Sequence, residues 1–431
     1  MSETNAQKVQ EVIIAGMSKT VANYDYAMSE LEALVAANNM HAALRIDQGL
    51  EKPNPATFFG KGKVVEIKEV AAANDLHIMV INADLTPSQV RNLEEQTDIQ
   101  IIDRTGLILE IFGNRARSKE AKLQVKIAQL QYQLPRLRTS ISNRLDQQAG
   151  AAAGGGGGFT NRGSGETQLE LNRRTIQDRI SHAKHELKEL NKDEVVRRSQ
   201  RDKAGLPNVA LVGYTNAGKS TTMNGLVKLF GKGEDKQVFE KDMLFATLDT
   251  SIRQLTFPDN KQLLLSDTVG FVSDLPHNLI NAFRSTLAEA ANADLLIQVI
   301  DYADPHYKEM MATTEKTLKE IGVHDVPMIY AFNKADLTEA DYPNQQDDQL
   351  IYTARDEASL QALTSMIKAK VFKNYVTTTL LIPFNDGEVV AYLNDHANIL
   401  KTDYLADGTQ LTVELNTVDA QRYEKYVVTP A

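Results

Sequence analysis

The sequence contains no cysteine, which excludes disulfides, zinc-thiolate sites, iron–sulfur clusters and thiol catalysis. It also lacks long apolar runs. The most apolar stretches, such as residues 295–300, fall far short of the ~20 residues that a membrane-spanning helix needs. The first ten residues are polar and lack the order of charged, apolar and small residues that marks a secretory signal. These absences predict a cytoplasmic protein without a membrane span.

The chain has 431 residues, which favours two or three domains, each large enough for its own apolar core. The net charge of −10 averages two unlike regions. Residues 113–203 carry 19 Lys and Arg against 10 Asp and Glu, whereas the rest of the chain is acidic. This basic region is either a segment that binds a polyanion or a solvated helical face, and charge alone leaves both interpretations open.

Hydrophobic periodicity divides the chain into four predicted segments of an α/β protein. Residues 1–112 alternate β-rich runs with helical patterns, which predicts a parallel sheet covered by helices. Residues 113–204 form a basic helical hairpin. The strand and helix alternation resumes over residues 205–372 and predicts a mixed, mostly parallel sheet. Residues 373–431 predict a small α+β domain whose hairpin turns at Asp407 and Gly408.

The basic hairpin is predicted from apolar residues that recur at spacings of three and four in two stretches. These residues are Leu123, Ile127, Leu130, Leu134 and Leu137, then Leu169, Ile176, Ile180, Ala183, Leu187 and Leu190. Residues 150–165 between them are rich in glycine and predict a mobile tip. Thr167 and Glu170 form a capping-box pattern, which predicts that the second helix starts just past that tip.

The β-rich run 208–212 leads directly into GYTNAGKS and then into a helical pattern over residues 221–229. This is the phosphate-binding motif GxxxxGKS in its required setting of strand, loop and helix. Its members are Gly213, Tyr214, Thr215, Asn216, Ala217, Gly218, Lys219 and Ser220. The glycines let backbone N–H groups turn toward phosphates, while Lys219 reaches the outer phosphates and Ser220 ligates Mg²⁺.

Two more motifs follow β-rich runs in the order that a GTPase requires. The first is DxxG, made of Asp267, Thr268, Val269 and Gly270. It places a carboxylate near Mg²⁺ and a glycine N–H near the γ-phosphate. The second is NKxD, made of Asn333, Lys334, Ala335 and Asp336. The Asp336 carboxylate selects guanine because it can accept from the N1–H and 2-amino donors that adenine lacks. Together the motifs predict a magnesium-dependent GTPase that converts GTP to GDP.

Two weaker motifs complete the predicted site. The first is FATLD, made of Phe245, Ala246, Thr247, Leu248 and Asp249. It lies where the threonine loop that completes the magnesium shell is expected, so the predicted metal ligands are Ser220, Thr247 and Asp267. The second is the loop of Thr353, Ala354 and Arg355, which is expected behind the guanine. Lys219, Thr247 and Gly270 are the predicted catalytic residues.

The sequence resembles the HflX-type GTPases of the Obg-HflX group over nearly its whole length. The resemblance rests on PATFFGKGKVV at residues 55–65, TNRGSGETQLELNRR at residues 160–174, and the FATLD, DTVGF and NKAD motifs. It implies a monomeric, ribosome-associated GTPase that binds the large ribosomal subunit and splits stalled or idle ribosomes. Arg162, Arg173 and Arg174 at and beyond the hairpin tip are then expected to contact rRNA phosphates.

Two other classes of function stay open from the sequence. One is an ATPase or GTPase that remodels rRNA and whose N-terminal domain binds a nucleotide. The other is a GTP-dependent regulatory switch whose partner is a protein. Activity that survives loss of Asp336 would favour the ATPase, and failure to sediment with ribosomal subunits would favour the protein switch.

Single residues add further expectations. Phe271 stands where Ras-like GTPases carry a water-orienting glutamine, which predicts slow intrinsic hydrolysis. Asn216 stands where related GTPases hold K⁺, although it equally fits a turn-stabilising role. Residues 60–63 (GKGK) lack a complete phosphate-loop pattern and predict either an RNA contact or a helix start. His182 and His185 are expected on a helix surface.

Overall fold

The computed structural model describes residues 9–20, 23–150, 160–203, 206–231, 244–245, 251–273 and 290–428. The chain divides into two compact units. The first comprises residues up to 196 together with a short segment around Phe245, and the second comprises most of the remainder. Across the described residues, no helix combines the length and apolarity needed to span a membrane.

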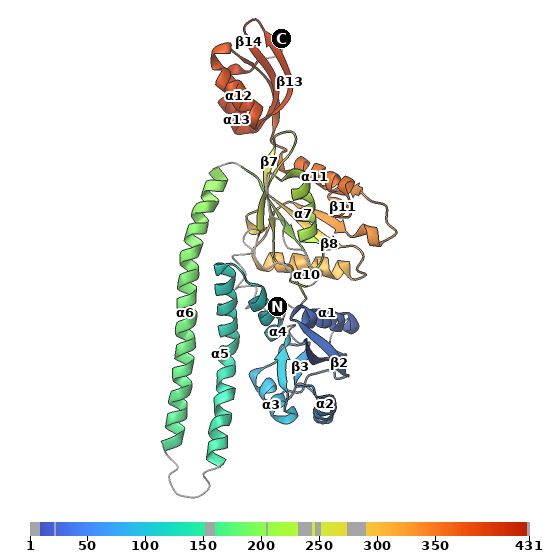
Figure 1. The fold of residues 1–431 in the computed structure, drawn as a ribbon, viewed down its shortest axis with the longest axis vertical. Coiled ribbons are helices and arrows are strands. Elements are labelled where there is room, and N and C mark those ends of the chain that lie inside the picture. The colour runs from blue at the N-terminus through green and yellow to red at the C-terminus, as the bar shows by residue number, and fades with distance from the viewer. Residues whose placement is uncertain are drawn as a thin grey trace, which may run out of the picture. The chain divides into compact units, whose positions relative to one another are not determined.

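The first unit contains a four-stranded parallel sheet in the order β2-β1-β3-β4. Figure 1 labels β2 and β3 of this sheet and the helices α1 to α4 of the same unit. Its elements are β1 (Gln10–Met17), α1 (Tyr24–Ala37), β2 (Met40–Gln48), α2 (Lys61–Ala73), β3 (Ile78–Ile81), α3 (Pro87–Thr97), β4 (Gln100–Asp103) and α4 (Arg104–Arg115). Ile13, Phe59, Ile67 and Met79 are buried together in its core. The predicted parallel sheet is confirmed, and Gly60 precedes the first residue of α2, so the GKGK stretch is a helix start.

Helices α5 (Lys119–Gly150) and α6 (Thr160–Lys203) form the predicted hairpin and lie side by side in Figure 1. Leu123 and Ile127 of α5 pack with Ala183 of α6 in an apolar seam. His182 and His185 are exposed on the helix surface, as predicted. The periodic apolar residues therefore hold the two helices together and leave the charged residues on the outside.

The predicted start of the second helix was wrong, whereas the first helix ends where the predicted tip begins. α5 continues to Gly150, and α6 begins at Thr160, seven residues before the proposed cap at Thr167, so it includes Gly163 and Gly165. A glycine costs a helix only about 1 kcal/mol. Propagation of an existing helix adds a hydrogen bond with each residue, so two glycines do not end it. The central part of the predicted mobile tip, residues 151–159, lies outside the described residues.

The second unit contains a seven-stranded sheet in the order β10-β11-β9-β8-β5-β7-β6. Its strands are β5 (Asn208–Val212), β6 (Ser251–Thr256), β7 (Gln262–Asp267), β8 (Leu295–Asp301), β9 (Met328–Asn333), β10 (Asn344–Gln346) and β11 (Gln349–Ile351). Its helices include α7 (Lys219–Phe230), α10 (Tyr307–Glu320) and α11 (Glu357–Val371). Only β6 and β10 pair antiparallel to their neighbours, which confirms the predicted mixed, mostly parallel sheet. The carboxyl ends of β5, β7, β8 and β9 therefore meet at one edge.

The C-terminal part of this unit is a three-stranded antiparallel sheet in the order β12-β14-β13. Its elements are β12 (Val376–Ile382), α12 (Gly387–His396), β13 (Asn398–Leu405), β14 (Gly408–Leu415) and α13 (Thr417–Arg422). Leu380, Leu393 and Leu411 belong to its apolar core. The α+β prediction and the hairpin turn before Gly408 are confirmed.

The turn between β6 and β7 is fixed to this C-terminal sheet and its helix. Asn260 Nδ2 donates to the carbonyl oxygens of Asn394 and Ala397, both at 3.0 Å. Lys261 is 9% exposed, and its Nζ donates to Glu414 Oε1 at 2.8 Å. The far end of the β6–β7 hairpin is therefore held by several directed contacts.

Candidate nucleotide-binding site

The phosphate-loop motif wraps around its own lysine between β5 and α7. Lys219 is 7% exposed, and its Nζ donates to the carbonyl oxygens of Gly213 at 3.0 Å and Tyr214 at 2.8 Å. Gly218 has a φ of 94°, and a Cβ there would lie 2.1 Å from Asn333 Nδ2. Only glycine fits this position, because both the backbone conformation and the close approach of Asn333 exclude a side chain.

Burial changes the proton affinity of the Lys219 amine. Loss of solvent lowers the pKa of Lys219 to about 8, and the nearby Asp267 carboxylate opposes that shift. A desolvated ammonium beside the N-terminus of α7 gains more from an anion than a hydrated lysine would. The loop is therefore suited to hold a phosphate group.

Asp267, the last residue of β7, provides a test of whether the site fits Mg²⁺. It is fully buried, its Oδ2 accepts from Ser220 Oγ at 2.7 Å, and its Oδ1 has no hydrogen-bond partner among the described residues. Burial raises the pKa of the Asp267 carboxyl, while Lys219 and Ser220 oppose the rise. A buried carboxylate oxygen without a partner, next to a hydroxyl, is the oxygen donor set that Mg²⁺ prefers. Bound there by Ser220 and Asp267, the ion would neutralise phosphate charge.

Asn333 joins the guanine-recognition motif to two other loops. Its Nδ2 donates to the Ala217 carbonyl oxygen at 2.9 Å, and its Oδ1 accepts from the Ala354 N–H at 2.9 Å. Thr353 and Ala354 are buried, whereas Asp336 and Arg355 are exposed. The structure thus brings the phosphate loop, NKAD and the loop after β11 into one site, with the Asp336 carboxylate open to solvent.

The DxxG segment lies directly against the phosphate loop. A Cβ on Gly270 would be 2.7 Å from Thr215 Cγ2 and 3.1 Å from Lys219 Nζ, so this position has room for glycine only. Thr268 Oγ1 donates to the Leu211 carbonyl oxygen at 2.7 Å, and the Val269 side chain is buried. Phe271 is 1% exposed, so its ring packs inside the protein and offers the site no polar group.

Of the FATLD motif, the structure describes only Phe245. Phe245 belongs to the first unit, where it is 2% exposed and packs edge-on against Phe112, with ring centroids 4.6 Å apart. The other members, Ala246, Thr247, Leu248 and Asp249, lie outside the described residues. Asn216 is exposed and has a φ of 62°, a left-handed conformation that suits a turn.

Sequence reasoning missed two residues next to the site. Asp301, the last residue of β8, accepts from Lys334 Nζ at 2.7 Å and holds the lysine of NKAD. Tyr352 is fully buried, and its hydroxyl bonds to Thr222 Oγ1 of α7 at 2.7 Å. Asp301 could have been found, since it is a polar residue at a strand end like Asp267. The Tyr352 contact has no comparable signal in the sequence.

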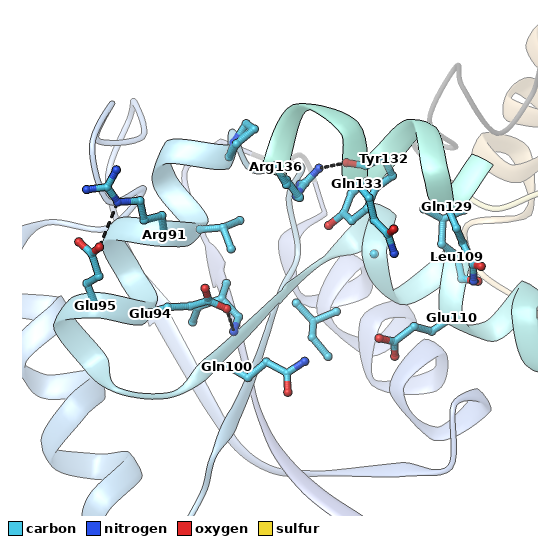
Figure 2. Close-up of a pocket in the computed structure, with 15 residues that line it drawn as sticks. Arg91, Glu94, Glu95, Gln100, Leu109, Glu110, Gln129, Tyr132, Gln133 and Arg136 are labelled. Atoms are coloured by element: carbon cyan, nitrogen blue, oxygen red, sulfur yellow. Dashed lines mark hydrogen bonds and ion pairs between the residues drawn. The ribbon is translucent and has the colours of Figure 1, made fainter. Parts of the chain in front are cut away.

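The first unit has a separate pocket of about 820 Å³ lined by α3, β4, α4 and α5 (Figure 2). Both arginines that line it are already in ion pairs. Arg91 pairs with Glu95 at 3.0 Å, and Arg136 pairs with Asp103 at 2.6 Å. Glu94 also lines the pocket, and burial raises the pKa of its carboxyl. The arginines of this pocket are therefore already neutralised by carboxylates, which makes it a poorer site for a triphosphate than the loop around Lys219.

Three known family descriptions match consecutive parts of the chain. They are a GTP-binding GTPase N-terminal region over residues 25–113, a GTP-binding GTPase middle region over residues 115–201, and a 50S ribosome-binding GTPase over residues 208–334. Among solved structures, a GTP-binding protein from Sulfolobus solfataricus in complex with GDP aligns with 84% of this chain and 99% of its own. That alignment has 23% identity and a TM-score of 0.44.

Relatives with curated names match over most of the chain. The GTPase HflX of Caldanaerobacter subterraneus subsp. tengcongensis is 35% identical over 428 residues, which cover 99% of this chain and 96% of the relative. The GTPase HflX of Escherichia coli is 37% identical over 406 residues, which cover 92% and 91%. With its phosphate-loop, DxxG and NKxD motifs in place, the chain belongs to the HflX family of GTPases and is a GTP-hydrolysing enzyme.

Proposed function

We propose that this GTPase acts on the large ribosomal subunit and splits stalled or idle ribosomes, working in the cytoplasm as a monomer. The basic hairpin carries the proposal. Apolar residues of α5 and α6, among them Leu123, Ile127 and Ala183, pack in the seam between the two helices. Arg173, Arg174, Lys184 and Lys188 are exposed on α6. A long rod with cationic side chains on its surface suits rRNA phosphates. The match of residues 208–334 to a 50S ribosome-binding GTPase supports the same partner.

We infer a division of labour along the four segments proposed from the sequence. Residues 205–372 bind and hydrolyse GTP, and residues 113–204 reach the ribosome. Residues 1–112 and 373–431 flank these two parts as separate folds. The match of residues 115–201 to a distinct middle region of GTP-binding GTPases supports treating the hairpin as its own segment.

The proposed site assigns each motif one part of GTP. Lys219 and the backbone of residues 213–220 hold the phosphates, while Ser220, Asp267 and Thr247 ligate Mg²⁺. The Gly270 N–H faces the γ-phosphate in the DxxG segment formed with Thr268 and Val269. Asp336 recognises guanine with Asn333, Lys334 and Ala335, and Thr353, Ala354 and Arg355 lie behind the base. Phe245, Ala246, Leu248 and Asp249 flank Thr247 in its loop.

Hydrolysis transfers the γ-phosphoryl group to water and breaks its bond to the β–γ bridging oxygen. Lys219 and the Gly270 N–H stabilise the negative charge that develops on the phosphoryl oxygens. The buried Phe271 ring cannot orient the water, so that role falls to a partner. The unstimulated rate is expected to be on the order of 10⁻³ per second or below.

The base assignment is tested by Asp336→Asn. The amide replaces a carboxylate acceptor with a group that also carries donors, so GTP should bind more weakly and xanthine nucleotides more tightly. Competition between labelled GDP and xanthosine diphosphate measures the change. The double variant Lys316→Ala/Lys319→Ala, on the exposed face of α10, is the control and should keep the wild-type preference. Normal GTP turnover by Asp336→Asn would contradict the assignment.

The ribosome proposal is tested by sedimentation with purified subunits in the presence of a GTP analogue or GDP. We expect binding to the large subunit with the analogue, and an affinity that falls steeply with salt. Arg173→Ala/Arg174→Ala should weaken binding, whereas Lys316→Ala/Lys319→Ala, which removes the same charge elsewhere, should not. Equal binding by the two double variants would remove the hairpin from the interface.

The hairpin tip is tested by deletion of residues 151–161. We expect unchanged folding and basal hydrolysis but impaired subunit dissociation or ribosome-stimulated hydrolysis. A passive tether would change only loop-closure entropy, by about 1 kcal/mol or less. Subunit splitting at the wild-type rate by the deletion variant would leave the tip as a passive linker.

We also propose that Asn216 holds K⁺ beside the phosphates and adds positive charge there. Replacement of K⁺ by Na⁺ should then slow GTP hydrolysis in the wild type and have no further effect in Asn216→Ala. Equal rates in the two salts would leave Asn216 with its role in the turn alone.

A further inference from the structure

The side chain of Tyr214, the second residue of the phosphate loop, makes contacts that its motif does not require. It is 5% exposed. Its hydroxyl oxygen accepts the Ser273 N–H at 2.6 Å and also bonds to Ser273 Oγ at 2.6 Å. One phenol group therefore fixes both the backbone and the side chain of Ser273, 59 residues farther along the chain.

Backbone hydrogen bonds beside this phenol pair the same two segments. The Thr215 N–H donates to the Phe271 carbonyl oxygen at 2.8 Å, and the Phe271 N–H donates to the Gly213 carbonyl oxygen at 3.2 Å. Residues 270–273 are thus joined to the phosphate loop by a short ladder, with the Tyr214 phenol at its far end. We call the ladder and the phenol contact the Tyr214 latch.

The latch shares its residues with the lysine that faces the phosphates. Lys219 Nζ is bonded to the carbonyl oxygens of Gly213 and Tyr214, and Gly270 lies close enough that a Cβ on it would be 3.1 Å from this nitrogen. Phe271 and Val272 are buried and contribute no polar side-chain atom. The position of Gly270 relative to Lys219 is therefore set by the backbone ladder and by the phenol.

We propose that Tyr214 is a positioning residue for GTP hydrolysis. Its phenol holds residues 270–273 against the phosphate loop, so that the Gly270 N–H stays aimed at the oxygens where charge develops in the transition state. This inference rests on the proposed assignment of Lys219 and Gly270 to the phosphates of GTP. It gives a tyrosine side chain a part in orienting a segment whose own side chains are apolar at positions 271 and 272.

The test is Tyr214→Phe, which removes the hydroxyl and keeps the ring. We expect kcat for GTP to fall about tenfold, as for one lost hydrogen bond to a half-buried N–H. KM and the Kd for labelled GDP should stay within threefold. Tyr330→Phe is the matched control because it removes a phenol that donates to Glu315 at 3.3 Å on the same sheet, and its kcat should stay within twofold.

Ser273 supplies the second arm of the test. Ser273→Ala loses the Oγ contact but keeps the N–H, so kcat should fall only about threefold, and Ser273→Thr should restore it. The double variant with Tyr214→Phe should be no slower than Tyr214→Phe alone, because both changes remove one interaction. If Tyr214→Phe fails to fold, Ser273→Ala decides, and an unchanged kcat in that variant overturns the proposal.

Two outcomes with Tyr214→Phe would overturn the latch. One is a kcat within twofold of the wild type, and the other is a rise in KM and in the Kd for GDP as large as the fall in kcat. Full activity of the Lys219→Ala variant would instead contradict the proposed phosphate site, so the failure of the latch and the failure of the phosphate site are distinguishable.

Discussion

Two buried aspartates end parallel strands in the two units, and they differ in how completely their oxygens are bonded. Asp103 ends β4, and Asp267 ends β7. Asp103 is 1% exposed and accepts from Tyr132 Oη at 2.6 Å, Arg136 Nη2 at 2.6 Å, the Gly106 N–H at 2.7 Å and the Leu85 N–H at 3.2 Å. Asp267 accepts a side-chain hydrogen bond from Ser220, and its second oxygen has no partner in the described part of the chain.

This difference separates a structural carboxylate from one suited to bind a ligand. Burial raises the pKa of both carboxyls. At Asp103 four donors oppose that rise and offset the cost of burying the charge. At Asp267 the Lys219 charge, Ser220 and the Thr268 backbone also oppose the rise, but one oxygen has no hydrogen-bond partner among the described residues. A cation is the partner that would complete the site. Position at a strand end thus identifies candidate residues, and the count of donors distinguishes their roles.

The largest effect is expected from Asp267→Asn. Magnesium-dependent GTP hydrolysis should fall on the order of 10³-fold, because an amide is a poor ligand for Mg²⁺ and carries no negative charge to offset that of the ion. The melting temperature should change little, because a buried carboxylate with one unbonded oxygen is removed but the buried Lys219 ammonium loses the negative charge that faces it. Steady-state hydrolysis and a thermal melt measure the two effects. If Asp267→Asn retained GTP turnover, Asp267 would be a structural carboxylate like Asp103 and not a ligand of Mg²⁺.

The opposite result is expected from Asp103→Asn. Arg136 and two backbone N–H groups lose a charged acceptor, and we expect the first unit to lose about 3 kcal/mol of stability. Hydrogen exchange of amides in β4 and α4 reports this loss. GTP hydrolysis measured well below the melting temperature should match the wild type. Slowed exchange in β4 would show that the four donors do not compensate the carboxylate.

Ligand binding should stabilise one unit selectively. GDP with Mg²⁺ at 100 times its Kd is expected to stabilise the second unit by about 2.7 kcal/mol. Hydrogen exchange should then slow in β5 and α7 but not in β4. A chelator should reverse part of this protection in the wild type and none of it in Asp267→Asn. Equal protection of β4 would contradict the selectivity.

The smallest effect is expected from Tyr132→Phe. It removes one of the four donors to Asp103 and leaves Arg136 and both N–H groups in place, so the cost should be about 1 kcal/mol. Urea unfolding, with hydrogen exchange as the probe of the first unit, measures this loss of stability. A cost as large as that of Asp103→Asn would mean that the phenol, and not the arginine, carries most of the compensation.

Motifs that follow a strand directly were predictable from the sequence. The phosphate loop, Asp267 and Asn333 each follow a β-rich run, and parallel strands bring their carboxyl ends to one edge. The sequence therefore predicted a nucleotide site from three motifs whose residues the parallel strands bring to one edge. The alternation of strands and helices likewise predicted the parallel sheet of residues 1–112 and the mixed, mostly parallel sheet of residues 205–372, and the hairpin pattern predicted the small α+β domain.

Contacts between residues far apart in the sequence were not predictable. Tyr132 lies 29 residues from Asp103, and Tyr214 lies 59 residues from Ser273, so no spacing rule connects them. The start of α6 was misjudged for a different reason. The pattern at Thr167 is a local signal. The residue at which α6 begins depends instead on how far hydrogen bonding propagates toward the N-terminus of a helix of 44 residues.

The contacts that hold the β6–β7 turn against the C-terminal sheet and its helix restrict how the hairpin can move. A strand that slides by one residue moves about 3.3 Å. Such a slide would break the contacts of Asn260 with α12 and of Lys261 with Glu414 together. The turn end of the β6–β7 hairpin is therefore fixed in position. A rearrangement around Asp267, at the other end of β7, must proceed by bending or twisting of the strands. The C-terminal domain thus provides the fixed point about which the hairpin can bend.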